Sequence, residues 1–169
     1  MAVSVSAHVI IKRSNEVLLI RRADTGFWAT PGGRVEHKET FEQAAIREIQ
    51  EECGITVKID GICGVFSNPN WDEGIHTIVF VSRFDGEIIL QKTIEAKEIS
   101  FYNINKLPID ILYWHSDYIK SAYSGVLIKN HVFSAKSPHQ VLNRHIDYVG
   151  ISEAERQSLM GQYVKSAEE

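Results

Sequence analysis

Three glutamates near the end of one helical stretch are the residues of this 169-residue chain best suited to chemistry. Glu48, Glu51 and Glu52 project within an arc of about 100° if each residue advances the helix by about 100°. Glu48 is three and four residues from the other two, so these carboxylates are neighbours that repel one another. The helix dipole also disfavours negative charge in the last turns, by roughly 0.3–1 kcal/mol for each group. A hard divalent cation bound by these oxygens would remove both penalties.

A solvated acidic helix face is the ordinary alternative, and geometry alone leaves both interpretations open. The surrounding positions favour the metal site. The stretch reads Gly33, five residues, Glu39, seven residues, Arg47-Glu48-Ile49, Gln50, Glu51-Glu52, Cys53 and Gly54-Ile55. This segment resembles the Nudix box, and it meets every fixed position of that signature, including both glycines, the arginine and all four glutamates.

The resemblance implies a loop–helix–loop platform that binds Mg²⁺ or Mn²⁺. Arg47 would orient the glutamates by ion pairing, and its i,i+4 relation to Glu51 makes one such pair feasible. Glu39 would assist from the loop or hold the platform. Carried over by position, the metal ligands are three carboxylates and one backbone carbonyl, those of Glu48, Glu51, Glu52 and Gly32.

The activity that the resemblance implies is hydrolysis of a diphosphate linkage in a nucleotide derivative. A water activated by the metal attacks phosphorus, and a carboxylate takes its proton. Family members differ in which glutamate is the base. Glu52 is one candidate, and Glu95 or Glu98 in the loop after the box is another. For Glu95 and Glu98, ordinary solvated charge is the alternative interpretation.

Two arginines and one tryptophan are candidates for substrate binding. Arg21 and Arg22 precede the glycine loop, and a guanidinium matches phosphate geometry. Because adjacent strand residues point to opposite faces, we expect at most one of them to reach phosphate. Trp71 lies in a turn-rich connection and fits a base or sugar contact or a loop anchor equally well. Trp28 and His115 are expected to pack in the interior.

The pattern of apolar and turn residues predicts the elements that position these groups. Pro31-Gly32-Gly33 is expected to be a loop, and Thr40 and Gln43 have the spacing of a helix capping box, with Gly54 at the helix end. Strands are expected at 3–12, 16–22, 27–30, 55–66, 75–84, 87–90 and 99–103, and helices at 40–53, 112–122 and 152–164.

This order predicts an α/β fold, a sandwich of the α/β/α type with a mixed sheet. It fits the Nudix fold over residues 3 to about 122, and we expect a Nudix hydrolase domain at 1–125. Residues 126–169 are expected to form a helical C-terminal extension that packs on the domain or on a partner subunit. Apolar residues at helical spacing near its end are compatible with a homodimer or with a helix that covers the core.

The composition of the chain limits the classes of partner and ligand that it is expected to bind. A formal net charge of −4 argues against a DNA-binding protein, while a small phosphorylated substrate stays compatible because a metal ion supplies local positive charge. No run of residues is long and apolar enough for a membrane span or a signal peptide, so a cytoplasmic location is expected. The two cysteines form neither a disulfide framework nor a zinc site.

The sequence therefore predicts a magnesium-dependent pyrophosphohydrolase whose small-molecule substrate is a nucleoside diphosphate derivative. ADP-ribose or a sugar nucleotide is favoured. Two alternatives stay open: a house-cleaning hydrolase of nucleoside triphosphates, and a nucleotide sensor of the same fold without catalytic activity.

Overall fold

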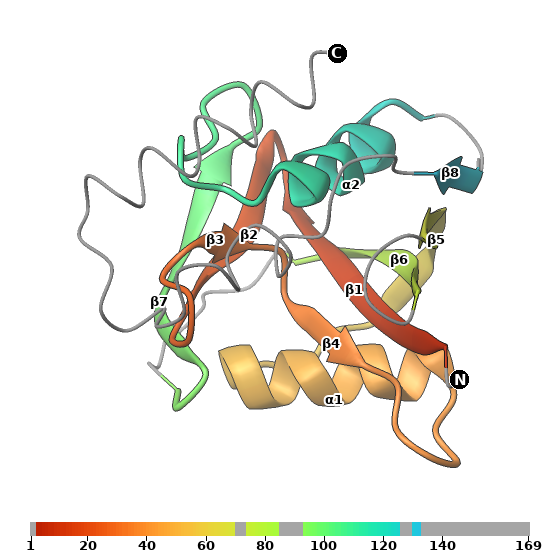
Figure 1. Cartoon of the computed structure of the whole chain (residues 1–169). Helices are drawn as coiled ribbons and strands as arrows, with labels where there is room; N and C mark the ends of the chain where they lie inside the picture. The colour runs from red at the N-terminus through yellow and green to blue at the C-terminus, as the bar shows by residue number, and fades with distance from the viewer. Residues whose placement is uncertain (1–2, 70–73, 85–92, 126–129, 133–169) are drawn as a thin grey trace, which may run out of the picture.

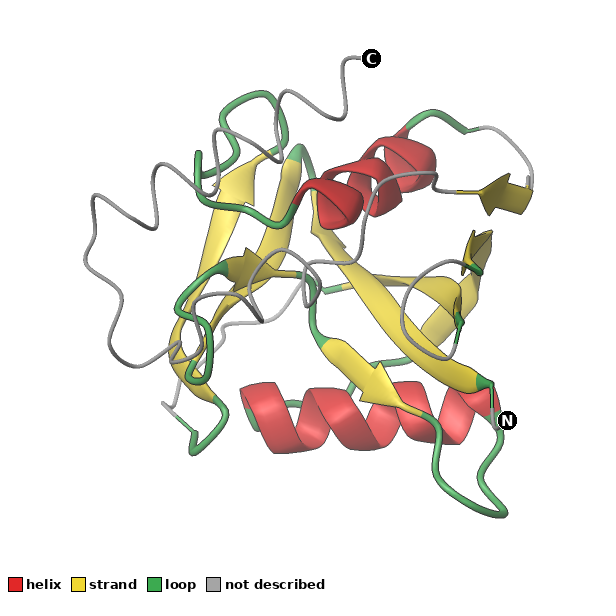
Figure 2. Cartoon of the chain, viewed as in Figure 1, coloured by secondary structure: helices red, strands yellow, loops and turns green. Residues whose placement is uncertain are grey.

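The computed structural model describes residues 3–69, 74–84, 93–125 and 130–132, and these form one mixed sheet with a helix on either side (Figures 1 and 2). The helices are α1 (Phe41–Cys53) and α2 (Tyr113–Tyr123). The strands are β1 (Ser4–Arg13), β2 (Glu16–Arg22), β3 (Trp28–Ala29), β4 (Gly32–Arg34), β5 (Ile59–Asn68), β6 (Ile75–Arg83), β7 (Ala96–Asn103) and β8 (Asn130–Val132). The expected α/β/α sandwich is confirmed.

The sheet has the order β3-β2-β1-β6-β5-β8, with β4 pairing with β1 and β7 pairing with β2. The β1–β6 and β5–β8 pairs are parallel and the other pairs are antiparallel. The long parallel register of β1 with β6 joins the two halves of the sheet, so β1 lies at its centre. The glycine-rich strand β4 lies beside β1, where it can hold α1 close to the centre of the sheet.

Both faces of β1 and β2 are buried, which explains their nearly continuous apolar sequence. Alternate residues of these strands enter two separate clusters. The first cluster lies under α1 and includes Val9, Leu18 and Ile49, while the second lies under α2 and includes Ile10 and Tyr118. Burial of this apolar surface fixes both helices against the sheet.

The caps of α1 confirm the prediction from sequence. The backbone N–H of Gln43 donates to Thr40 Oγ1 at 3.2 Å, and the N–H of Thr40 donates to Gln43 Oε1 at 2.8 Å. Gly54 ends the helix with a φ of 68°, a left-handed conformation that costs little without a Cβ. These caps fix the register of α1 and hence which of its glutamates face the sheet.

The expectation that Pro31-Gly32-Gly33 forms a loop is wrong for the two glycines. Gly32 and Gly33 begin β4 and pair antiparallel with His8 and Ala7 of β1. Gly32 has a φ of 137°, and a Cβ there would collide with the carbonyl of Ala7 and the Cα of His8. Glycines signal a turn in sequence, but here they permit a close approach between two strands.

Other element boundaries differ by a few residues. The strand expected at 55–66 is β5 and begins at Ile59, and the strand expected at 99–103 is β7 and begins at Ala96. The strand expected at 87–90 and the helix expected at 152–164 lie outside the described residues, as does most of the expected extension. Among the described residues, no helix is both long and apolar enough to cross a membrane.

Candidate active site

A cleft of about 580 Å³ opens between α2, the end of α1 and the central strands. Its wall on the α1 side carries acidic residues and the glycines of β4, and its other wall carries polar residues of β1 and β6 with aromatic residues of α2. Acidic and aromatic groups therefore meet in one concave space. Such a space is the usual place for a small-molecule site.

Three carboxylates gather at the acidic wall. Each of Glu48, Glu52 and Glu95 offers a carboxylate oxygen, and these oxygens all lie within 4.8 Å of one another. Glu48 and Glu52 are one helical turn apart on α1, whereas Glu95 comes from the turn before β7. The structure thus joins two glutamates of the helix to one of the two loop glutamates that the sequence left open.

Glu52 is held in place by the glycine strand. Its Oε2 accepts a hydrogen bond from the backbone N–H of Gly32 at 2.7 Å, and the residue is only 3% exposed. Burial raises the pKa of Glu52 to about 8, the Gly32 hydrogen bond and Arg22 oppose this shift, and Glu48 and Glu95 add to it. In the free protein, ionisation of the buried Glu52 carboxyl group costs free energy. A bound cation would stabilise its charged form.

Glu48 lies directly against the backbone of Gly33, where any Cβ would collide with its carboxylate. The absence of a Cβ at Gly33 lets this helix side chain lie against the strand, and a larger residue would require the Glu48 carboxylate to move. Burial raises the pKa of Glu48, Arg47 opposes this shift through a hydrogen bond, and Glu51 and Glu95 add to it by repulsion.

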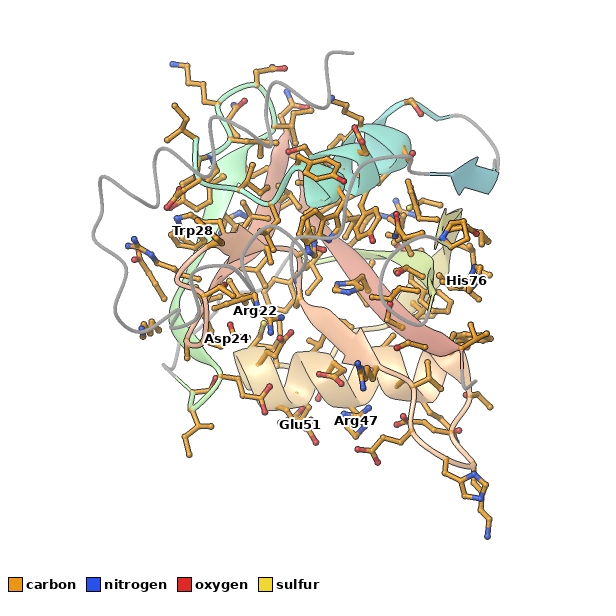
Figure 3. The ribbon with its side chains drawn as sticks, viewed as in Figure 1. Arg22, Asp24, Trp28, Arg47, Glu51 and His76 are labelled. Atoms are coloured by element: carbon orange, nitrogen blue, oxygen red, sulfur yellow. The ribbon has the colours of Figure 1, made fainter. Side chains whose placement is uncertain are left out.

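Arg47 connects three glutamates on the outer side of the helix. Its Nε and Nη2 bind the two carboxylate oxygens of Glu39 at 2.9 and 3.0 Å. Its Nη1 binds Glu48 Oε1 at 2.9 Å and Glu51 Oε2 at 3.0 Å, the i,i+4 pair expected from sequence. Figure 3 shows Arg47 and Glu51 together on α1. Glu51 belongs to this arginine network and is not part of the three-carboxylate cluster.

Thr93 fixes the turn that carries Glu95. Its hydroxyl donates to the carbonyl of Glu52 at 3.1 Å and accepts from the backbone N–H groups of Glu95 and Ala96 at 3.3 and 3.0 Å. The N–H of Ala23 also donates to the Glu95 carbonyl at 2.8 Å. The end of α1, the turn before β7 and the loop after β2 are therefore tied together at the cluster.

The structure separates the two arginines as their alternation on β2 predicts. Arg22 lines the cleft and binds both oxygens of Asp24 at 2.9 and 2.7 Å, and Figure 3 shows the pair beside the C-terminal half of α1. Arg21 is not among the residues that line the cleft. It lies 3.8 Å from Glu98 and 3.9 Å from Asp110. Glu98 is therefore paired outside the cluster, and Glu95 is inside it.

Two neutral histidines lie deeper in the cleft. The N–H of Thr30 donates to His115 Nδ1 at 3.1 Å, so the proton of neutral His115 is on Nε2. The Thr30 carbonyl lies 3.3 Å from His8 Nδ1 and can only accept, so His8 carries its proton there. Burial lowers the pKa of His8 to about 4, and burial also lowers the pKa of His115 well below its usual value, with His8 and Arg22 adding to the shift of His115.

These shifts predict how stability depends on pH. A histidine whose folded-state pKa is lowered contributes stability above its unfolded pKa of about 6.5, and this contribution is lost as pH falls toward the folded-state value. We expect His115→Asn, which keeps an acceptor for the Thr30 N–H, to lose less unfolding free energy than the wild type between pH 7 and pH 5. Urea unfolding at several pH values measures the two slopes, and equal slopes would contradict the assigned burial.

The remaining candidates from sequence have mixed outcomes. Trp28 is 4% exposed and packs edge-to-face on Tyr102 at 4.8 Å, which confirms its role in the interior. Trp71 lies outside the described residues. Sequence reasoning did not single out His8 as a residue of the cleft. The alternation of polar and apolar residues in the first strand was the available signal.

The residues of the cluster fit a divalent cation. They offer oxygen atoms only, which hard cations prefer. Both helix carboxylates are buried enough to raise their pKa, and all three are close enough to repel one another. Glu48, Glu52 and Glu95 could hold the ion, and the Gly32 carbonyl stays a further candidate ligand.

Comparisons with known proteins agree with this geometry. The family model for the NUDIX domain matches residues 2–122. An ADP-ribose pyrophosphatase of Methanocaldococcus jannaschii is 40% identical over 111 residues, which are 62% of this chain and 64% of that protein. A putative 8-oxo-dGTP diphosphatase of Bacillus subtilis is 32% identical over 101 residues, 60% of this chain and 66% of that protein. The matches thus cover less than two thirds of either relative.

A solved structure shares the fold. The crystal structure of a NUDIX hydrolase from Nitrosomonas europaea superposes with a TM-score of 0.70 over 79% of this chain and 80% of that one, at 24% sequence identity. At this identity, the similarity concerns the arrangement of helices and strands.

Proposed function

Because this chain belongs to the Nudix hydrolase superfamily, we propose that it is a pyrophosphohydrolase that depends on Mg²⁺ or Mn²⁺ and cleaves the diphosphate linkage of a nucleoside diphosphate derivative. One observation carries the proposal: three carboxylates from two separate elements meet beside Arg22 in a cleft of about 580 Å³. A solvated acidic surface would not need burial of Glu52 or a glycine strand that holds it.

Glu48, Glu52 and Glu95 would hold the cation in this proposal. The bound ion would neutralise diphosphate oxygens and lower the pKa of a coordinated water. Arg22 would bind a phosphate oxygen, since it lines the cleft with a planar guanidinium that already pairs with Asp24. Arg47, held by Glu39, would position Glu48 from outside the cleft.

The reaction requires a water oxygen to bond to one phosphorus while the bridging P–O bond breaks. We assign Glu95 as the carboxylate that accepts the water proton. It is the exposed member of the cluster, so it can pass the proton on to solvent, whereas Glu52 is buried with one oxygen bound to Gly32. The leaving phosphate departs with the electrons of the broken bond.

The favoured substrates are ADP-ribose and sugar nucleotides. The relative from Methanocaldococcus jannaschii, named as an ADP-ribose pyrophosphatase, supports this class, and its 40% identity exceeds the 32% of the putative 8-oxo-dGTP diphosphatase. The second relative makes a nucleoside triphosphate the alternative. Cleavage of ADP-ribose would yield AMP and ribose 5-phosphate, whereas a triphosphate would yield a nucleoside monophosphate and pyrophosphate.

A panel assay tests the proposal. ADP-ribose, sugar nucleotides and canonical and oxidised triphosphates are each incubated with the protein in Mg²⁺ and in excess chelator, and the products are identified by chromatography. We expect hydrolysis of at least one diphosphate in Mg²⁺ and loss of turnover in chelator. Activity that survives chelation would contradict the proposed site. Binding of nucleotides without hydrolysis of any would favour the nucleotide-sensor alternative instead.

A further inference from the structure

The end of the cleft farthest from the carboxylates has a polar floor built from three neighbouring strands. The register of the sheet aligns Ser4 of β1 with Ile75 of β6, and Ile75 with Asn68 of β5. The next row on the same face contains Ser6 and Thr77. All five residues line the cleft. The residues between them, such as His76, point to the other face, where His76 Nδ1 lies 3.1 Å from Ser67 Oγ (Figure 3).

Asn68 differs from its polar neighbours on this floor. Ser6 and Thr77 bind each other at 2.7 Å, and Thr77 also bonds with Tyr118 of α2. Asn68 is 1% exposed, yet within the part of the chain that the structure describes neither its Nδ2 nor its Oδ1 has a hydrogen-bond partner. A buried amide without partners is costly, and native proteins rarely retain one without a reason.

The distance from Asn68 to the carboxylates suggests what its partner is. Glu52 binds Gly32, which pairs with His8, whereas Asn68 is level with Ser4. His8 and Ser4 are four residues apart on β1, on the order of 13 Å at about 3.3 Å per residue. If the phosphate of a substrate lies at the carboxylates, the substrate reaches Asn68 only when it also carries a sugar ring and a base. Trp114, which is partly exposed, also lines the cleft and offers aromatic surface to a base.

We propose that Asn68 is a specificity-determining residue whose carboxamide binds the edge of the substrate's nucleobase. This inference rests on the proposed function and states which part of the substrate the cleft recognises. A carboxamide has a donor and an acceptor side by side, so it matches a base edge with an adjacent acceptor and donor, such as the amidine of adenine or the lactam of guanine. A ribose hydroxyl would satisfy only one of the two atoms at a time.

Asn68→Leu tests the inference because leucine has a similar volume and no polar atoms. The substrate identified in the panel is compared with an analogue whose base carries hydrogen in place of the exocyclic amino or oxo group. The wild type should prefer the parent substrate by roughly 10–100-fold in kcat/KM, mostly through KM, because a bidentate contact to a base discriminates by that much. In Asn68→Leu, this preference should fall to within about threefold because the discriminating contact is gone.

Asn105→Leu is the matched control because it makes the same change at an exposed turn residue outside the cleft lining, and it should keep the full preference. Asn68→Asp, which keeps an acceptor and loses the donor, gives a second variant should Asn68→Leu fail to fold, and it should also lose preference. Circular dichroism and thermal unfolding check that each variant is folded.

Two results would overturn the inference. If Asn68→Leu hydrolyses both substrates with the wild-type preference, Asn68 does not recognise the base. If it loses the same factor for both substrates, the residue supports the cleft without recognising the base. Either result leaves the proposed function intact, because that function fails only when the wild type itself shows no metal-dependent hydrolysis.

Discussion

Glu52→Gln is expected to lose turnover by roughly 10³-fold or more while the protein stays folded. Glutamine keeps the size of the side chain and an oxygen that accepts the Gly32 hydrogen bond, but it removes one negative charge from the cluster. Without that charge the divalent cation and the water it activates are held poorly. Initial rates on the panel substrate in saturating Mg²⁺, with thermal unfolding in the absence of metal, measure both effects.

The stability of this variant has a predicted sign. The pKa of Glu52 is raised to about 8, above its unfolded value of about 4.5, so the folded state binds a proton more tightly. Wild-type stability without metal should therefore fall as pH rises from about 5 to 8, a loss that glutamine avoids. We expect Glu52→Gln to match the wild type near pH 5 and to unfold at a higher temperature at pH 8.

Glu42→Gln is the control because Glu42 is exposed in the first turn of α1, and it should keep wild-type turnover. Glu51→Gln tests whether Glu51 is a metal ligand, as expected from sequence, or acts only through Arg47. If Glu51 acts only through Arg47, as its contacts suggest, its loss should be much smaller than that of Glu52→Gln. Near-normal turnover of Glu52→Gln with metal present would show that Glu52 has no part in the reaction.

Glu95→Gln is expected to lower kcat by about 10²–10⁴-fold, the range typical of a missing general base. The side chain stays in the turn held by Thr93, but its amide cannot take a proton from water. Excess Mg²⁺ should not restore the rate. Recovery at high Mg²⁺ would mean that Glu95 acts only as a metal ligand and that another group is the base.

Glu98→Gln is the matched control, three residues along the same segment. Glu98 pairs with Arg21 at 3.8 Å outside the carboxylate cluster, and such exposed ion pairs contribute little, about 0–1 kcal/mol. We expect turnover within about threefold of the wild type because no chemistry passes through this residue. A loss of turnover equal to that of Glu95→Gln would show that the assignment of Glu95 as the base is wrong.

Sequence reasoning identified much of the platform because its signals are local. The capping box of Thr40 and the glycine at position 54 fix the ends of α1, and helical periodicity then sets the directions of Glu48 and Glu52. The pair between Arg47 and Glu51 also follows from spacing along one helix. These features depend on residues within one or two turns of each other, so no tertiary information is needed.

Features that depend on contacts between segments distant in the sequence could not be predicted from local signals. The choice of Glu95 over Glu98 follows from the register of β7 on β2 and from the Thr93 hydroxyl, which spans 41 positions to Glu52. Gly32 is part of a strand because it pairs with β1, and local sequence propensity does not predict this pairing. Asn68 enters the cleft only because three strands align it with Ser4, although its sequence context is typical of a turn.

The most direct test of the metal site is a titration of the ligand-free protein with Mn²⁺, followed by the paramagnetic resonance signal of the free ion, and repeated with a nucleoside diphosphate present. The wild type should bind Mn²⁺ saturably, Mg²⁺ should compete for the same site, and a variant with glutamine at positions 48 and 52 should lose this binding while staying folded. If the intact protein takes up no ion under either condition, or if the double variant binds as well as the wild type, the carboxylate cluster is not a metal site.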